Sequence, residues 1–386
     1  MGKFIHNNLS MFNVSRISSL ALSKEETNRY REEFYSSEKN RLAQNVVSKT
    51  DPLEACLNRL TIDASNHVFS HKVKTKSFMV NNANILTFVS RSCFKVDEVK
   101  PMTNQKSSGR CWLFAVLNAM RIPFIKSMGM DEMEFSQAHL FFWDKIERSH
   151  YFLTTIVSVF KRSTDQTPDS RLASYLLHDP INDGGQWDMV CNIIEKHGVM
   201  PKQAFPDTVS CESSRNMNRI LKSKLREFAQ ELYIAVTNDK ESDEDVQKRI
   251  KGYMSTVFRI VGICLGVPPE NFTWQYYDKS KKAHKIGPIS PLEFYTTHVK
   301  PHFNVLDKAC LVTDPRPSNP TGQTYTVDCL GNVVGAKMTV YNNQSVDVLA
   351  DLASKSIQAG EPVWFGCDVS KFFSRKKGFL DLELFG

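Results

Sequence analysis

The order of hydrophobic and polar positions predicts that the first half of the chain is mainly helical. Apolar residues recur every three or four positions after Cys111 and again after Ser136, as they do on the buried face of a helix. A third pattern of this kind follows Gly184 and stops at Gly198, and glycine is common just beyond a helix C-terminus. We therefore expect three helices within residues 107–205.

In the second half the pattern changes from helices to strands. Residues 206–266 are charged and helical, and the run from Val246 keeps an apolar face until Gly266. Four shorter segments follow, which predict two strands at residues 325–327 and 338–341, a helix at 346–357 and a buried strand at 362–369. A Ser-x-x-Glu start also predicts an N-terminal helix at residues 23–39. Helices followed by strands indicate an α+β fold.

Composition describes an ordinary globular chain. The 386 residues are 41% hydrophobic and 24% charged, and no apolar run reaches the ~18 residues that span a bilayer. The nine cysteines are odd in number, scattered and never spaced as Cys-x-x-Cys, which argues against a zinc site and a disulfide framework. We therefore expect no metal, no cofactor, buried free thiols and a reducing compartment.

The net charge of +7 is mild, and the cationic residues are dispersed. The one tight cluster, residues 375–377, is short, so a solvated surface explains it better than a nucleic-acid site does. Residues 1–24 have no acidic side chain and faintly resemble a mitochondrial transit peptide, although arginine is scarce. We expect a cytoplasmic protein, with a mitochondrial location as the alternative.

The most informative local feature is a glutamine six residues before a cysteine. Cys111 opens an apolar helix, and the backbone N–H groups and dipole of a helix N-terminus favour a thiolate. Gln105 precedes it in the loop, from which its side-chain amide can donate to an oxyanion. A nucleophile and an oxyanion donor on one short segment suit acyl transfer by cysteine. Alone, Cys111 would be interpreted more simply as a buried core cysteine.

The segment from Asn104 to Trp112 reads Asn-Gln-Lys-Ser-Ser-Gly-Arg-Cys-Trp. It resembles the active-site motif of papain-like cysteine peptidases, in the form typical of the bleomycin hydrolase branch. Ser108 stands where secreted members of the family carry a second, disulfide-bonded cysteine, as in the intracellular branch. The likeness continues, in the family's order, through residues 134–137, 141–145, 182–189, 287–289, 314–317 and 364–369.

The resemblance implies a papain-like fold, in which a helical lobe and a β-rich lobe meet at a cleft. Cys111 would be the nucleophile, and Gln105 and the N–H of Cys111 would form the oxyanion hole. Gly184 and Gly185 would line the cleft, where a missing side chain lets substrate backbone approach, although a turn before a helix is the simpler alternative. Four parts of the chain follow: an extension at 1–41, the helical lobe at 42–205, a helical insertion at 206–290 and the start of the β-rich lobe at 291–386.

The same resemblance implies an aminopeptidase that removes residues from peptides with a free N-terminus and hydrolyses the amide of bleomycin. It also implies a homohexameric ring with active sites facing an inner chamber. No membrane partner is expected. Two other functions stay open at this point: an inactive homologue that binds peptides or family subunits, and a basic nucleic-acid-binding protein.

The family's catalytic histidine precedes an alanine, and its asparagine lies in Asn-Ser-Trp-Gly; neither motif occurs in this chain. We therefore expect a chain that stops short of both residues, with an incomplete β-rich lobe. Seven histidines follow Cys111, and for each we favour a structural or surface role over catalysis. None is assigned as the base: His139, His150, His178, His197, His284, His298 and His302.

Overall fold

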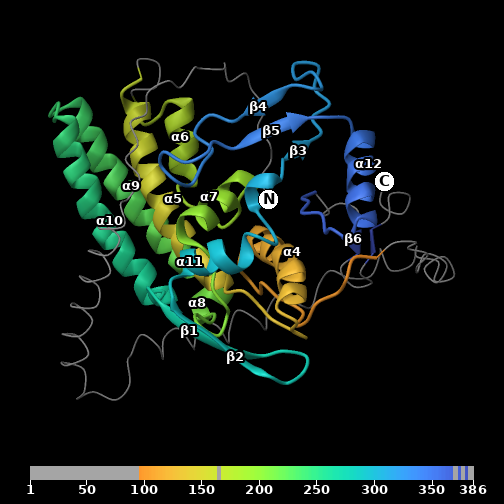
Figure 1. Ribbon diagram of the computed structural model, residues 1–386. Helices are drawn as coiled ribbons and strands as arrows, with labels where there is room; N and C mark the ends of the chain where they lie inside the picture. Colours follow the sequence, from red (N-terminus) through yellow and green to blue (C-terminus); the bar gives the residue numbers. More distant parts are fainter. Residues whose placement is uncertain (1–94, 163–166, 368–372, 375–378, 381–386) are drawn as a thin grey trace, which may run out of the picture. The chain divides into compact units, whose positions relative to one another are not determined.

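The computed structural model describes residues 95–162, 167–367, 373–374 and 379–380 (Figure 1). Contacts divide the chain into two compact units, of which the larger contains Val96–Pro362 and the smaller contains Val363–Gly386. The predicted site residues therefore all belong to the larger unit. The helix predicted at residues 23–39 lies outside the described residues.

Helix α5 (Gln137–Phe160) is the central element of the larger unit. The hydroxyl of Ser136 caps it by accepting the N–H of His139 at 3.1 Å, and residues 137–150 are buried without exception. Five helices contact it: α4 (Cys111–Ser127), α6 (Arg171–His178), α7 (Trp187–His197), α9 (Arg215–Thr237) and α10 (Asp243–Leu265). The three helices predicted from periodicity are α4, α5 and α7, and α6 is an addition to them.

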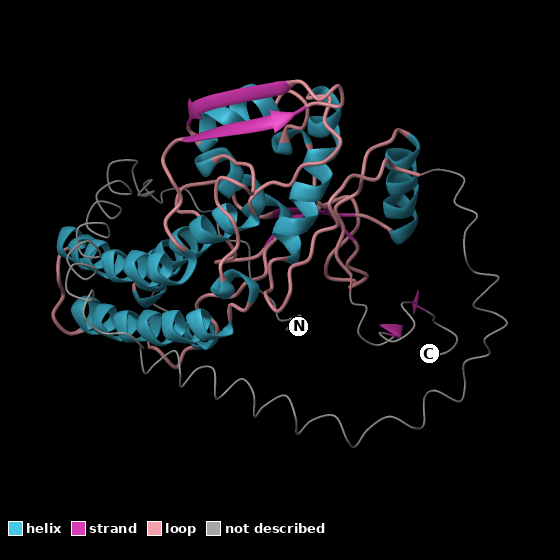
Figure 2. Ribbon diagram, turned by 90° about the horizontal axis from the view of Figure 1, so that it is seen from below, coloured by secondary structure: helices cyan, strands magenta, loops and turns pink. Residues whose placement is uncertain are grey.

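Helices α9 and α10 lie side by side and pack on α5 (Figures 1 and 2). The short helix α8 (Val209–Glu212) precedes them. Ser242 caps α10 by accepting the N–H of Asp245 at 3.2 Å, and the helix ends at Gly266, whose φ of +76° suits glycine. The predicted end of this apolar run is therefore confirmed. On α9, buried residues recur at helical spacing: Met217, Leu221, Leu225, Phe228 and Leu232.

A β-hairpin follows these helices, and the sequence pattern did not predict it. Strands β1 (Phe272–Tyr277) and β2 (Ala283–Ile289) pair antiparallel. The ring of Trp274 lies 6.2 Å from that of Phe124 at the end of α4. An aromatic pair of this kind stabilises a fold by about 0.5–1.5 kcal/mol beyond the effect of the area it buries. Fully buried residues alternate with exposed ones along β1 but not along β2. The two-residue period that identifies a strand is therefore weak in this part of the sequence.

Beyond the hairpin, short elements lead into a small sheet. They are α11 (Pro291–Phe294), a π-helical turn (Tyr295–Val299), a 3-10 turn (Val305–Asp307) and the strands β3 (Leu311–Val312), β4 (Thr324–Thr326) and β5 (Val340–Asn343). In this sheet β5 is central, parallel to β3 and antiparallel to β4. Asp188 of α7 accepts the N–H of Val340 at 2.8 Å, so the sheet is fixed to the helix before it. Both predicted strands exist, each shifted by one or two residues.

Helix α12 (Val346–Gln358) matches its prediction, and Ser345 caps it. The buried strand predicted at residues 362–369 is wrong over the part that the structure describes. Residues 362–367 are irregular, and the Phe365 side chain is 75% exposed. Apolar composition alone does not make a strand when no partner strand pairs with it in the described residues. Two short strands of the smaller unit, β6 (Phe373–Ser374) and β7 (Phe379–Leu380), pair with each other instead.

A buried carboxylate joins α5 to α7. Glu147 is fully buried, and its Oε1 lies 2.8 Å from Nε2 of His197 and 2.7 Å from Nζ of Lys196. The ring of Trp143 stacks on that of His197 at 4.0 Å. Burial alone would raise the pKa of Glu147, but the hydrogen bond and charge of His197, with the charge of Lys196, lower it to about 2.

Because the pKa of Glu147 is lowered in the folded protein, part of the free energy of unfolding should be lost in acid. The contribution of Glu147 is complete above its unfolded pKa near 4.5 and is lost as the pH falls toward 2, because the unfolded chain takes up the proton first. Between pH 6 and pH 3 the loss should be about 2 kcal/mol. Urea unfolding at the two pH values measures it. Glu147→Gln should remove this loss. Glu244→Gln, at an exposed site, is the control and should keep it. If Glu147→Gln and the unmodified protein lose the same free energy of unfolding between pH 6 and pH 3, the assignment is contradicted.

Candidate active site

Cys111 is the first residue of α4, and its side chain is exposed. The carbonyl of Arg110 accepts the N–H groups of Leu113 and Phe114, each at 3.0 Å, which begins the helix. Within residues 95–162 and 167–367, nothing accepts the N–H of Cys111 and no side chain bonds to its thiol. A thiol and an unpaired backbone donor therefore stand together at the start of one helix.

The loop before Cys111 is a tight turn that fixes the backbone of Gln105. The carbonyl of Gln105 accepts the hydroxyl of Ser108 at 2.6 Å, and Asn104 accepts the N–H of Lys106 at 2.8 Å. Lys106 has a φ of +54°, which reverses the chain direction within the turn. The side-chain oxygen of Gln105 is buried, and in the described part of the chain nothing bonds to it. The amide of Gln105 thus keeps unused hydrogen-bonding capacity.

Arg110, immediately before the cysteine, anchors this turn, and sequence reasoning missed it. Its side chain is fully buried. Its Nε donates to Ser108 Oγ at 2.9 Å, and its Nη1 donates to Asp207 at 2.5 Å. The guanidinium also lies over the rings of Phe114 and Phe141, at 5.1 and 5.4 Å from their centroids. A charged residue inside an otherwise polar loop gives no sequence signal of burial.

The structure packs Gly185 against the Cys111 segment and leaves the neighbouring Gly184 exposed. The indole N–H of Trp112 donates to the carbonyl of Asp183 at 2.6 Å. A Cβ on Gly185 would lie 2.6 Å from the Trp112 ring, and a Cβ on Gly109 would lie 2.6 Å from that of Asp183. Glycine at 109 and 185 therefore permits close packing of the two loops, whereas Gly184 is exposed and a Cβ there would meet only Asn182 Oδ1, at 4.0 Å.

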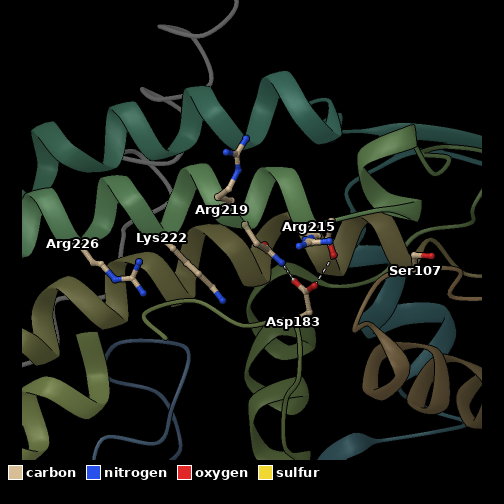
Figure 3. Close-up of a pocket in the computed structure, with 8 residues that line it drawn as sticks. Ser107, Asp183, Arg215, Arg219, Lys222 and Arg226 are labelled. Carbon is tan, nitrogen blue, oxygen red and sulfur yellow. Dashed lines mark hydrogen bonds between the residues drawn. The ribbon is translucent and has the colours of Figure 1, made fainter. Parts of the chain in front are cut away.

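Asp183 is the second residue that sequence reasoning missed. Its carboxylate lies 2.6 Å from Nζ of Lys145 and accepts hydrogen bonds from Ser214 at 2.5 Å and Asn218 at 2.8 Å (Figure 3). Lys145 is fully buried in α5 and also donates to the carbonyl of Asn182 at 2.8 Å. Burial alone would raise the pKa of Asp183, but the charge and hydrogen bond of Lys145 hold it well below its usual range.

The remaining described thiols differ from that of Cys111. Burial raises the pKa of Cys191 and of Cys329 to about 12, and it also raises the pKa of Cys211, Cys264 and Cys310. Of the described cysteines only Cys111 and Cys367 are exposed. Because a thiolate is the reactive form, the other five are poorly suited to nucleophilic chemistry at neutral pH.

Three of the histidines that follow Cys111 have partners elsewhere. The ring of His139 bonds to the carbonyl of His197 at 3.0 Å, and His197 bonds to Glu147. His284 lies 2.8 Å from Asp278 beside the β1–β2 turn. In the part of the chain that the structure describes, no histidine ring is hydrogen-bonded to Cys111.

The sequence matches the Peptidase C1-like family over residues 21–86 and 82–386. The chain belongs to this family. Bleomycin hydrolase of Gallus gallus is 48% identical over 344 residues, which cover 89% of this chain and 70% of that protein. Bleomycin hydrolase of Homo sapiens is 46% identical over 369 residues, covering 96% of this chain and 76% of that protein.

A more distant relative is "Cysteine proteinase 1, mitochondrial" of Saccharomyces cerevisiae (strain YJM789), 37% identical over 374 residues, 95% of this chain and 70% of that protein. Among solved structures, PepW from Lactobacillus rhamnosis HN001 matches with a TM-score of 0.75 and 31% identity, covering 95% of this chain and 76% of that one. The predicted papain-like α+β fold and the prediction of a cysteine-type peptidase of the bleomycin hydrolase type are confirmed for this Peptidase C1-like chain.

Among the described helices, none is both long and apolar enough to cross a bilayer. In the same residues, no three histidine, cysteine, aspartate or glutamate side chains gather to hold a metal ion.

Asp183→Asn should loosen the active-site loops. Asparagine keeps an oxygen that accepts from Lys145, Ser214 or Asn218 but loses the charge, so we expect a loss of about 1–3 kcal/mol in the free energy of urea unfolding. Asp179→Asn is the matched control, because its pair with Lys222 is partly exposed and should cost about 1 kcal/mol or less. Equal losses in the two variants would contradict the role given to Asp183.

Proposed function

We propose that Cys111 is the nucleophile of this peptidase. Its thiolate attacks the carbonyl carbon of a substrate amide, and the carbonyl oxygen becomes an oxyanion. The N–H of Cys111 and the amide N–H of Gln105 donate to that oxyanion. The observation that carries this proposal is the exposed thiol at the start of α4, next to its own unpaired backbone N–H. The Gln105 side chain precedes it in the same turn, and the oxygen of its amide is buried without a partner among the described residues.

The reaction also requires a base that takes the thiol proton and returns it to the leaving amine. The family resemblance implies a histidine of the β-rich lobe, oriented by an asparagine. Among the described residues no histidine is bonded to Cys111, so none of them is assigned as this base.

The proposed substrates are peptides with a free N-terminus, cleaved as by an aminopeptidase. Two relatives are named bleomycin hydrolase, so the amide of bleomycin is a second proposed substrate. Gly184 is exposed, and a Cβ there would meet only Asn182 Oδ1, at 4.0 Å, which suits a position past which substrate backbone runs. A homohexamer and a cytoplasmic location complete the proposal; the alternative location is mitochondrial, a word that the name of one yeast relative contains.

Cys111 should be the most reactive thiol of the folded protein. We expect limiting iodoacetamide to modify Cys111 first, because the buried cysteines are held as thiols and Cys367 has no helix N-terminus beside it. Peptide mapping by mass spectrometry measures the order of modification. Cys367 is the internal control for exposure alone, and faster labelling at Cys367 or at a buried cysteine would exclude Cys111 as the activated thiol.

Gln105→Ala should act on the chemical step. In the active enzyme we expect kcat for aminoacyl-coumarin hydrolysis to fall about 10²- to 10³-fold with little change in KM, because the lost donor binds only the developing oxyanion. Cys111→Ala should abolish turnover. Gln275→Ala, at an exposed position of β1, is the control and should leave both constants unchanged. A change in KM alone for Gln105→Ala would assign the glutamine to substrate binding instead.

A further inference from the structure

A pocket of about 430 Å³ lies beside the proposed active site, against the first half of α9 (Figure 3). Four of its eight lining residues are cations of α9: Arg215, Arg219, Lys222 and Arg226. Their spacing of four, three and four residues places them along one side of the helix. Four other residues complete the lining: Ser107, Ser214, Asn218 and Asp183. Of these, only Asp183 carries a carboxylate.

The positive charge of this pocket is only partly neutralised. Lys222 pairs with Asp179 at 2.7 Å. Arg226 donates to the carbonyls of Leu177 at 2.8 Å and His178 at 2.6 Å, which fix its position but leave its charge unbalanced.

Two further guanidinium groups lack an anionic partner among the described residues. In the described part of the chain, neither Arg215 nor Arg219 forms an ion pair, and both are exposed. The one carboxylate in the wall, that of Asp183, is already engaged by Lys145. The pocket therefore keeps an excess of three guanidinium charges, which suits an anionic ligand.

The walls of the pocket connect it directly to the catalytic candidates. Ser107 belongs to the turn between Gln105 and Cys111, and its N–H donates to the carbonyl of Glu212 at 2.9 Å, just before α9. Asp183 precedes Gly184 in the loop whose carbonyl holds Trp112. Two loops that flank Cys111 in the fold therefore also form walls of this pocket.

We propose that this pocket binds carboxylate side chains of peptide substrates and gives the peptidase a preference for acidic sequences near the cleaved bond. This inference rests on the proposed function, because it takes the ligand of the pocket to be a peptide substrate. Eleven residues separate Arg215 from Arg226, which is about 16 Å along a helix. That length corresponds to about five residues of extended peptide. Guanidinium groups match carboxylates in planar, two-bonded geometry.

A peptide fits this pocket better than a nucleic acid does. Single-stranded nucleic acids are held by aromatic side chains on which bases stack, together with a basic track along the backbone. The eight lining residues include no aromatic side chain. The base-stacking part of nucleic-acid recognition is therefore missing from the lining, whereas a carboxylate needs only the guanidinium groups that are present.

The test measures binding in the Cys111→Ala protein, so that no turnover is needed. Fluorescein-labelled hexapeptides that differ only in carrying three glutamates or three glutamines are titrated, and fluorescence anisotropy gives Kd. We expect the glutamate peptide to bind about tenfold more tightly at low salt, with the difference shrinking by 0.3 M salt. Arg215→Gln/Arg219→Gln should remove most of this preference. Lys279→Gln/Lys285→Gln, an equal charge change on the β1–β2 hairpin, should keep it.

Each other outcome counts against the proposal. Equal affinity for the two peptides, or a preference that survives Arg215→Gln/Arg219→Gln, would overturn it. Tighter binding of a short oligothymidylate of equal charge, lost in the same variant, would replace the peptide by a nucleic acid. Because both variants change exposed side chains, matching unfolding midpoints establish that the fold is intact. Failure of Cys111 in thiol labelling would refute the proposed function without changing these affinities, so the two failures are distinguishable.

Discussion

The buried ion pair between Lys145 and Asp183 is the interaction on which the active-site region depends. Lys145 comes from the buried part of α5 and its ammonium group is fully buried, so the charge needs a fixed anion. Asp183 supplies that anion and also accepts hydrogen bonds from Ser214 and Asn218 of the α9 region. One carboxylate thus joins the central helix α5, the glycine-containing loop and the start of α9.

The loop that contains Asp183 also fixes the position of the Cys111 segment, through a backbone carbonyl. The carbonyl of Asp183 holds the Trp112 indole, one residue beyond the thiol, and the close approach of Gly109 to Asp183 leaves no room for the two loops to slide. On the other side, Arg110 ties the turn to Asp207. The Cys111 thiol, the Gln105 turn and the cationic face of α9 are therefore set relative to one another by buried polar contacts as well as by hydrophobic packing.

Sequence reasoning found the parts of this arrangement that local pattern encodes. Helical periodicity located α4, α5, α7 and α10, and the motif around Cys111 identified the family. It failed where the structure depends on partners distant in sequence. The β1–β2 hairpin has a clear alternation on one strand only, and residues 362–367 have a strand composition without a strand. Arg110 and Asp183 were missed for the same reason, since a buried charge is recognisable only once its partner, 97 or 38 residues away, is known.

The central claim is that these contacts aim the Cys111 thiol and two donors at one oxyanion. A crystal structure of the protein with a peptide aldehyde tests it most directly, because the aldehyde forms a tetrahedral adduct with a reactive thiol. The account predicts a bond to Sγ of Cys111, with the adduct oxygen about 2.7–3.1 Å from both the Cys111 N–H nitrogen and Nε2 of Gln105. An adduct on another cysteine, or an oxygen at Cys111 that faces solvent away from Gln105, would contradict it.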